Sequence, residues 1–198
     1  MFSYQKFLQR PINIKRPNPK LANIIITQYG GPNGELGASL RYLSQRYMMP
    51  DNITKGLLTD IGTEELGHLE MVGTLVQQLS NGAPPKEWLE MESWEYYADN
   101  GNCVFPQNAQ GVPFSAASIA VTGDPLTNLY EDLAAEQKAR AVYDNILRLS
   151  DDADVNEVIK FLRQREVVHF QRFGEAMQLL REKLNQKNVY YMNPAMDI

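Results

Sequence analysis

Two short stretches decide how this chain folds: Glu65-Leu66-Gly67-His68 and Glu166-Val167-Val168-His169. They contain the only two histidines among the 198 residues, and in both a glutamate precedes the histidine by three positions. On a helix, residues three apart lie on one face, so the carboxylate and the imidazole can reach the same metal ion. Two such helices can therefore hold two ions between them.

Both stretches interrupt the apolar stripe of a long helical pattern. The first helix of this kind is predicted from the N-cap Asp51 to about Ser80, before Asn81-Gly82 and Pro84-Pro85 end it. The second is predicted over about 154–185. Charged groups on a stripe that faces the core need a partner.

Two further helices each place a single glutamate toward the core. One is predicted over about 35–48 and carries Glu35, after a glycine-rich stretch at 30–34 that local rules interpret as a turn. The other begins at the N-cap Asp124, reaches about 150 and has Glu136 inside its apolar stripe. Glu131 and Asp132 lie away from the centre of that stripe.

The connection at about 81–123 predicts how these helices are joined. It holds six aromatic residues among prolines and glycines, without a sustained helical period. So long a connection fits a ferritin-like bundle, in which the second and third helices run parallel and a crossover returns along the bundle. We therefore expect an all-α, ferritin-like four-helix bundle over 20–185, an extended N-terminal arm at 1–19, and a C-terminal tail at 186–198 that makes oligomer contacts.

Composition excludes several classes of function. The net charge is -5 and no Lys/Arg-rich run occurs, which argues against a nucleic acid or an anionic membrane surface as the main partner. The sequence has no apolar run of about 18 residues and no apolar signal-peptide core, so we expect synthesis in the cytoplasm and no membrane span. Cys103 is the only cysteine, which excludes an intramolecular disulfide and a thiolate cluster; it is expected to be a packing residue or a free thiol.

The glutamates and histidines together form the ligand pattern of dinuclear carboxylate sites in bundle cores. Two helices give one glutamate each and the other two give a Glu-x-x-His each. Taken singly, such a glutamate is more often solvated or ion-paired, and such a histidine is as often an ordinary core residue. Their joint occurrence on four core faces favours a metal site, because unpaired buried carboxylates are costly. Oxygen and nitrogen donors suit manganese or iron, and Glu64 and Glu70 are expected to be solvated.

With these residues the chain resembles the manganese catalase family, and most closely its short spore-coat branch. The resemblance covers nearly all of residues 1–185. It rests on Gln28-Tyr29-Gly30-Gly31, Gly34-Glu35-Leu36, Arg41-Tyr42-Leu43, the run from Leu57 to Met71, Gly111-Val112-Pro113-Phe114 and the stretch from Leu129 to Glu136. It implies a ferritin-like bundle assembled as a homohexamer, with a first helix that continues through residues 30–34 either straight or with a kink or bulge.

The resemblance also implies roles for individual residues and a substrate. Hydrogen peroxide would be converted to water and dioxygen by two manganese ions per chain, and the protein would belong to the spore coat, with other coat proteins as partners. The implied metal ligands are Glu35 as the carboxylate bridging both ions, Glu65 and His68 for one ion, and Glu136 and His169 for the other. Glu166 as a base beside the ions and Tyr42 as a nearby hydrogen-bonding group complete the implied catalytic set.

Two alternatives remain open from the residues. A di-iron carboxylate oxidase or peroxidase fits the same pattern, with two iron ions and Glu166 as a sixth ligand. A mainly structural spore-coat component would keep the fold without the chemistry. Metal identity separates the first alternative from a catalase, and dioxygen release from peroxide separates the second.

Overall fold

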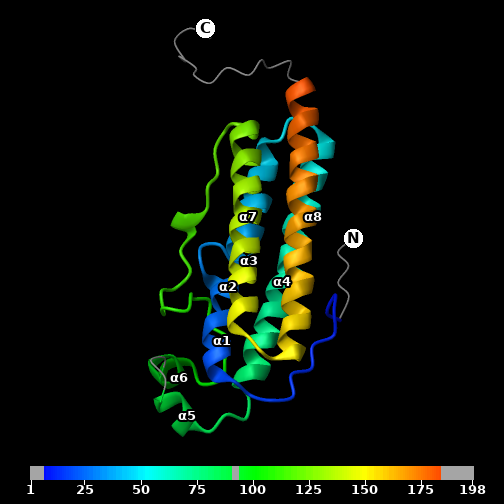
Figure 1. Cartoon of the computed structure of the whole chain (residues 1–198). Helices are drawn as coiled ribbons and strands as arrows, with labels where there is room; N and C mark the ends of the chain where they lie inside the picture. Colours follow the sequence, from blue (N-terminus) through cyan, green and yellow to red (C-terminus); the bar gives the residue numbers. More distant parts are fainter. Residues whose placement is uncertain (1–6, 91–93, 184–198) are drawn as a thin grey trace.

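A computed structural model describes residues 7–90 and 94–183 of this chain. Four helical rods lie side by side in it (Figure 1). Three rods are single helices: α4 (Asn52–Ser80), α7 (Pro125–Leu149) and α8 (Ala153–Lys183). The remaining rod consists of α1 (Pro19–Ile25), α2 (Thr27–Gly30) and α3 (Glu35–Gln45), followed by the short η1 (Arg46–Met48). The described residues include no strand, only an isolated bridge between Gln107 and Pro113. The all-α prediction is confirmed.

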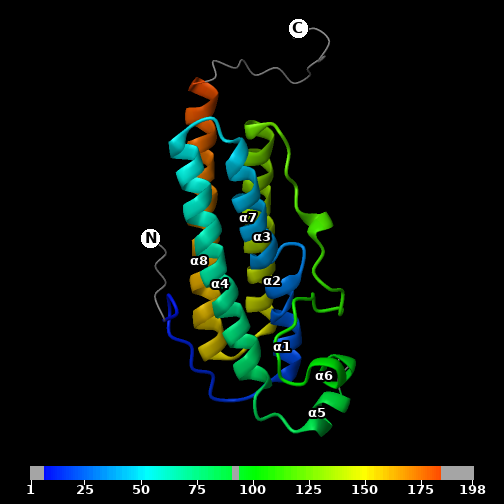
Figure 2. The same ribbon diagram turned by 180° about the vertical axis from the view of Figure 1, so that it is seen from behind.

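The crossover lies along the outside of the bundle. Because α4 and α7 run in the same direction, the chain returns the length of the bundle between them (Figures 1 and 2). It passes through α5 (Pro85–Leu89), α6 (Trp94–Asn100) and η2 (Ala116–Ser118). Trp88 is buried and stacks on Tyr96 with 6.3 Å between ring centroids. This path confirms the predicted ferritin-like bundle with one long crossover.

The predicted starts of two long helices are confirmed by their caps. The Asp51 carboxylate accepts hydrogen bonds of 2.9 Å from the backbone amides of Ile53 and Thr54 at the start of α4. The Asp124 carboxylate accepts one of 2.6 Å from the Thr127 amide, with Pro125 as the first residue of α7. Such caps satisfy backbone donors that a helix leaves free at its N-terminus.

The first rod breaks at residues 31–34. The Gly34 amide donates a 3.0 Å hydrogen bond to the Gly31 carbonyl, which closes a turn. A Cβ atom on Gly34 would lie 2.6 Å from the Gln28 carbonyl oxygen, so a larger residue would push the two segments apart. The turn predicted from local sequence is therefore confirmed, and the helix that the family resemblance implies is interrupted at this turn, although its parts stay in one rod. As a consequence, Glu35 is the first residue of α3, where the helix dipole favours a carboxylate.

The described part of the N-terminal arm runs extended over α4 and α8. The Ile14 amide donates to Gln78 Oε1 at 2.8 Å, and Gln78 Nε2 donates to the Ile12 carbonyl at 3.1 Å. Arg10 forms a 2.7 Å ion pair with Glu157 of α8. The C-terminal tail, with its predicted oligomer contacts, lies outside the described residues.

The core consists of two apolar clusters, one toward each end of the bundle. Every rod contributes to both, and in every rod a polar layer separates its two contributions. On α4, for example, Leu58 and Ile61 belong to one cluster and Met71 and Leu75 to the other. The layer between them holds the predicted ligands. In the described part of the chain, no helix is both long and apolar enough to cross a membrane.

Candidate metal centre

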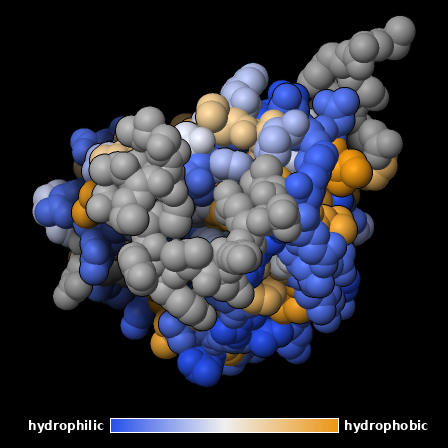
Figure 3. All heavy atoms as spheres, turned by 90° about the horizontal axis from the view of Figure 1, so that it is seen from above, coloured by the Kyte–Doolittle hydropathy of each residue, from blue (hydrophilic) through white to orange (hydrophobic). Residues whose placement is uncertain are grey.

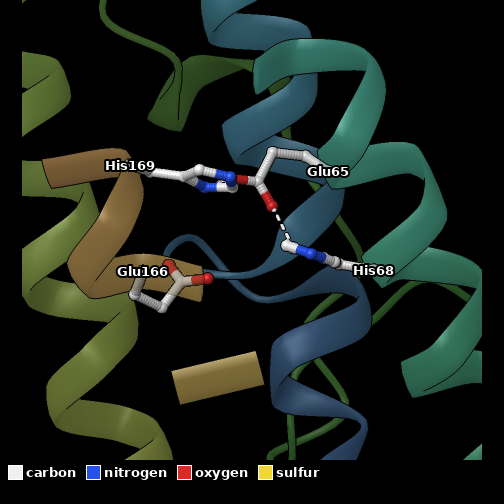
Figure 4. A group of neighbouring side chains, drawn as sticks. All are labelled: Glu65, His68, Glu166 and His169. Carbon is white, nitrogen blue, oxygen red and sulfur yellow. Dashed lines mark hydrogen bonds and ion pairs between the residues drawn. The ribbon is translucent and has the colours of Figure 1, made fainter. Parts of the chain in front are cut away.

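The polar layer brings together the side chains that the two Glu-x-x-His stretches predict. Glu65 and His68 come from α4 and face Glu166 and His169 of α8 (Figure 4). Each is at most 2% exposed, and each offers a ligand atom within 4.8 Å of the others. Apolar residues lie above and below the layer, so its buried polar atoms need partners within it.

Glu65 is the carboxylate shared by the two histidines. Its Oε2 atom lies 2.8 Å from His68 Nδ1 and its Oε1 atom lies 2.7 Å from His169 Nδ1. The two imidazoles stack with ring centroids 5.5 Å apart (Figure 4). The resemblance implies that Glu35 bridges both ions, which stays a prediction. The Glu35 contact with a histidine is to His68, whereas Glu65 contacts both histidines.

Glu35 and Glu136 lie on opposite sides of this shared carboxylate. Glu35 Oε2 is 3.7 Å from His68 Nδ1, and Glu136 Oε2 is 3.6 Å from His169 Nδ1. Each histidine therefore has its own glutamate as well as the shared Glu65. This makes two halves, each with one imidazole and one unshared carboxylate.

A tyrosine holds the outer oxygen of each unshared glutamate. The Tyr42 hydroxyl donates to Glu136 Oε1, and the Tyr143 hydroxyl donates to Glu35 Oε1. Both tyrosines are fully buried. Tyr42 was expected near the site, whereas Tyr143 was not among the predicted site residues. Its spacing, two helical turns after Glu136, places it on the same face and could have identified it.

These residues fit a pair of cations. Four buried atoms that face the layer have no hydrogen-bond partner: Glu65 Oε1, Glu136 Oε2, Glu166 Oε1 and His169 Nδ1. The Glu65 and His169 atoms are close enough for an ion pair, but they are not aligned as a hydrogen bond. Buried polar atoms without partners are rare because they are costly. Divalent ions bound between them would satisfy these atoms, because carboxylate oxygens and imidazole nitrogens are ligands that manganese and iron accept.

The pKa values of the buried carboxyl and imidazole groups also indicate that the layer favours positive charge. Burial, together with the charge of Glu65, raises the pKa of Glu35 to about 8. Burial also raises the pKa of Glu136 and that of Glu166. Burial opposes ionisation of Glu65 as well, but the two imidazoles hold its pKa below the usual range. Burial disfavours a charged His169, yet Glu65 and its neighbours raise the pKa of that imidazole to about 11. Protons on the histidines therefore supply the positive charge that the carboxylates attract.

Two acidic residues lie where the sequence did not predict them. Glu64 was expected to be solvated, but its side chain is only 14% exposed and its Oε2 lies 3.1 Å from His169 Nε2. Asp132 was placed away from the stripe, but it is fully buried one turn before Glu136, and neither carboxylate oxygen has a hydrogen-bond partner. Glu70 is exposed, as expected, and Cys103 is an exposed free thiol.

Comparison with known proteins identifies the family. A family model described as manganese containing catalase matches residues 1–191. The chain belongs to the manganese catalase family. It is 48% identical over 190 residues to Protein CotJC of Bacillus subtilis, and the aligned region covers 96% of this chain and 100% of that protein. It is 35% identical over 190 residues to a probable manganese catalase of Clostridium acetobutylicum, covering 95% of this chain and 84% of that one.

A solved structure supports the same assignment. KatB, a manganese catalase from Anabaena, superimposes with a TM-score of 0.85 at 30% identity, over 98% of this chain and 85% of that one. The fold of the family is therefore present along nearly the whole chain. The polar layer described above is the part of that fold in which a metal centre fits.

Proposed function

We propose that this protein disproportionates hydrogen peroxide, using two manganese ions held in the polar layer. The five proposed ligands are Glu35, Glu65, His68, Glu136 and His169. The observation that carries the proposal is the position of Glu65, whose two oxygens each face a different histidine inside a buried layer with unpartnered donor atoms. Membership of the manganese catalase family supports manganese as the metal.

The ligands divide into shared and unshared groups. Glu65 would bridge the two metal positions, while Glu35 and Glu136 would each add negative charge on one side. The hydroxyl groups of Tyr42 and Tyr143 orient these two carboxylates so that their inner oxygens face the histidines. A bound manganese pair would supply the two-electron redox change that peroxide disproportionation needs.

Glu166 is the proposed proton carrier. Its carboxylate is 2% exposed, belongs to the same group of donor atoms, and has one oxygen without a hydrogen-bond partner. Oxidation of one peroxide to dioxygen releases two protons and two electrons, and reduction of a second peroxide to two waters consumes them. A carboxylate beside the reacting oxygens can accept a proton in the first half-reaction and return it in the second.

Dioxygen release tests this proposal. The protein loaded with manganese should evolve one dioxygen for every two peroxides consumed, as measured with an oxygen electrode alongside a peroxide assay. The metal-free protein is the control and should evolve none. Peroxide consumption that depends on an added reductant, without dioxygen, would contradict a catalase and indicate a peroxidase.

A di-iron carboxylate enzyme is the second candidate. It is favoured by one observation, the inclusion of Glu166 among the four side chains whose ligand atoms lie within 4.8 Å of one another. A sixth carboxylate or imidazole ligand suits di-iron sites in helical bundles. Protein purified from cells supplied with both metals separates the candidates by the metal that it retains.

We further propose a homohexamer associated with the spore coat, together with other coat proteins. The basis is the resemblance to the spore-coat branch of the family and the similarity to Protein CotJC. Immunodetection in coat extracts of a spore-forming host tests the location. A protein that is found in the coat but releases no dioxygen when loaded with manganese would instead be a structural coat component.

A further inference from the structure

Glu64 contacts the outward-facing nitrogen of both histidines. Its Oε2 atom forms a 3.1 Å hydrogen bond with His169 Nε2, and its Oε1 atom lies 3.5 Å from His68 Nε2. Glu65, the next residue, contacts the Nδ1 atoms of the same two rings. Each imidazole therefore lies between two consecutive carboxylates of α4, one facing the layer and one facing outward.

Glu64 is itself held from the solvent side. Arg165 of α8 donates from Nε to Glu64 Oε1 at 2.7 Å and from Nη2 to Glu64 Oε2 at 3.2 Å. The guanidinium group therefore forms a bidentate contact with the carboxylate. Gln9 of the N-terminal arm donates a 3.2 Å hydrogen bond to Oε1. A two-pronged arginine contact fixes the plane of a carboxylate as well as its position.

We propose that Glu64 is a positioning residue that orients both metal-binding histidines, and that Arg165 holds it in place. This inference rests on the proposed metal site. A neutral imidazole has one N–H group, and giving it to Glu64 from Nε2 leaves the Nδ1 lone pair facing the layer. Partners of this kind fix the ring orientation of histidine ligands and strengthen metal binding. Glu64 makes this hydrogen bond to His169, and its other oxygen is within ion-pair distance of His68 Nε2, a buried atom without a hydrogen-bond partner.

The affinity for Mn²⁺ tests this role. Glu64→Gln keeps the shape of the side chain but replaces one accepting oxygen with an NH₂ group, which cannot accept a hydrogen bond from the ring. We expect Mn²⁺ binding by the full chain, measured by competition with a chelator, to weaken by about 10- to 100-fold. The matched control is Glu157→Gln, which makes the same chemical change at an exposed partner of the arm residue Arg10 and should bind Mn²⁺ like the wild type.

A second pair of variants leaves the carboxylate intact. Arg165→Gln releases Glu64 and should weaken Mn²⁺ binding by a smaller factor than Glu64→Gln does. Arg172→Gln removes an ion pair between α8 and Asp60 of α4 and should have no effect on binding. This pair also covers the case in which Glu64→Gln does not fold, as judged by circular dichroism.

The outcomes separate this role from the proposed function. Wild-type affinity in both Glu64→Gln and Arg165→Gln would overturn the positioning role, even if the protein evolves dioxygen. An equal loss in Arg165→Gln and Arg172→Gln would also overturn it, because helix docking would then explain the effect. A wild-type protein that binds Mn²⁺ but evolves no dioxygen would contradict the catalase proposal, and weaker binding by Glu64→Gln would still support the role of Glu64.

Discussion

At the scale of single residues, the chemistry depends on where each carboxylate lies relative to the two histidines. Glu65 is shared, Glu35 and Glu136 are not, and Glu166 lies beside the group. The spacing within the two Glu-x-x-His stretches predicts this convergence, because the α-helix alone puts such residues on one face. Which carboxylate lies between the two histidines could not be predicted in this way, because it depends on where α3 begins relative to α4.

Glu64 shows a second limit at this scale. It is four residues before His68 on the same helix, so its contact with that ring is within reach of the sequence pattern. Its burial and its contact with His169 require α8, and in particular Arg165, to lie alongside α4. The buried Asp132 is a similar case, because only the neighbouring helices show that its side of α7 is covered.

Glu166→Gln tests the proton carrier. The amide keeps the size of the side chain but cannot take up a proton at neutral pH, so turnover should fall by about 10²- to 10⁴-fold. The metal content should stay at the wild-type value, as measured by plasma mass spectrometry on the same sample. Loss of metal from this variant would contradict a proton-carrying role and indicate that Glu166 is a ligand.

At the scale of elements, the ends of the helices place the ligands. The turn at 31–34 puts Glu35 at the start of α3, and the Asp51 cap sets the start of α4. Caps and breaks of this kind depend on the few residues at the helix end, so the sequence predicts them well. The family resemblance implies only a helix that continues, straight or kinked, through this segment, because a shared fold does not determine how each helix is interrupted.

Asp51 is expected to stabilise the protein in a pH-dependent way. The Thr54 amide, together with Lys183, holds the pKa of Asp51 below its usual range. Its contribution is therefore complete above the usual pKa of an aspartate and is lost as the pH falls through the lowered value. Asp51→Ala should reduce the free energy of unfolding by about 0.5–2 kcal/mol at neutral pH.

Thermal unfolding of Asp51→Ala and the wild type across a pH series measures this effect. The difference between the two curves should become smaller in acid. Asp51→Asn, which still caps the helix, serves as the control and should lack the pH dependence. A difference between Asp51→Ala and the wild type that is the same at every pH would contradict this account of the cap.

Gly30→Ala tests how closely the first rod approaches the crossover. A Cβ atom at this position would overlap the backbone of Pro106 and Gln107, so the substitution should destabilise the protein by about 1–3 kcal/mol. The matched control is Gly56→Ala in α4, where a Cβ atom meets no atom within 4 Å and the lower flexibility of alanine should stabilise the helix. Denaturant unfolding measures both, and equal effects of the two substitutions would contradict the close approach.

At the scale of the whole molecule, two apolar clusters lie on either side of the polar layer, so the candidate metal centre is in the core of the bundle rather than in a surface cleft. The sequence predicted this arrangement through its crossover length and its interrupted stripes. On the visible part of the end where α8 finishes, hydrophobic side chains lie among hydrophilic ones (Figure 3). Exposed apolar residues occur elsewhere too, including Ile53, Leu89 and Leu149.

The proposed homohexamer has a defined mass. Six chains of 22.5 kDa each give a particle of about 135 kDa with closed symmetry. Burial of exposed apolar side chains between subunits would favour this assembly. Sedimentation velocity of the purified full chain should therefore show this species. A monomer that persists at high protein concentration would contradict the hexamer without affecting the assignment of the fold.

The metal content per chain tests the central claim most directly. The protein should be purified without chelators from cells supplied with both manganese and iron, and then measured by plasma mass spectrometry. The account predicts two manganese ions per chain, one for each half of the centre around Glu65. Two iron ions per chain, or no metal in a folded protein, would contradict it.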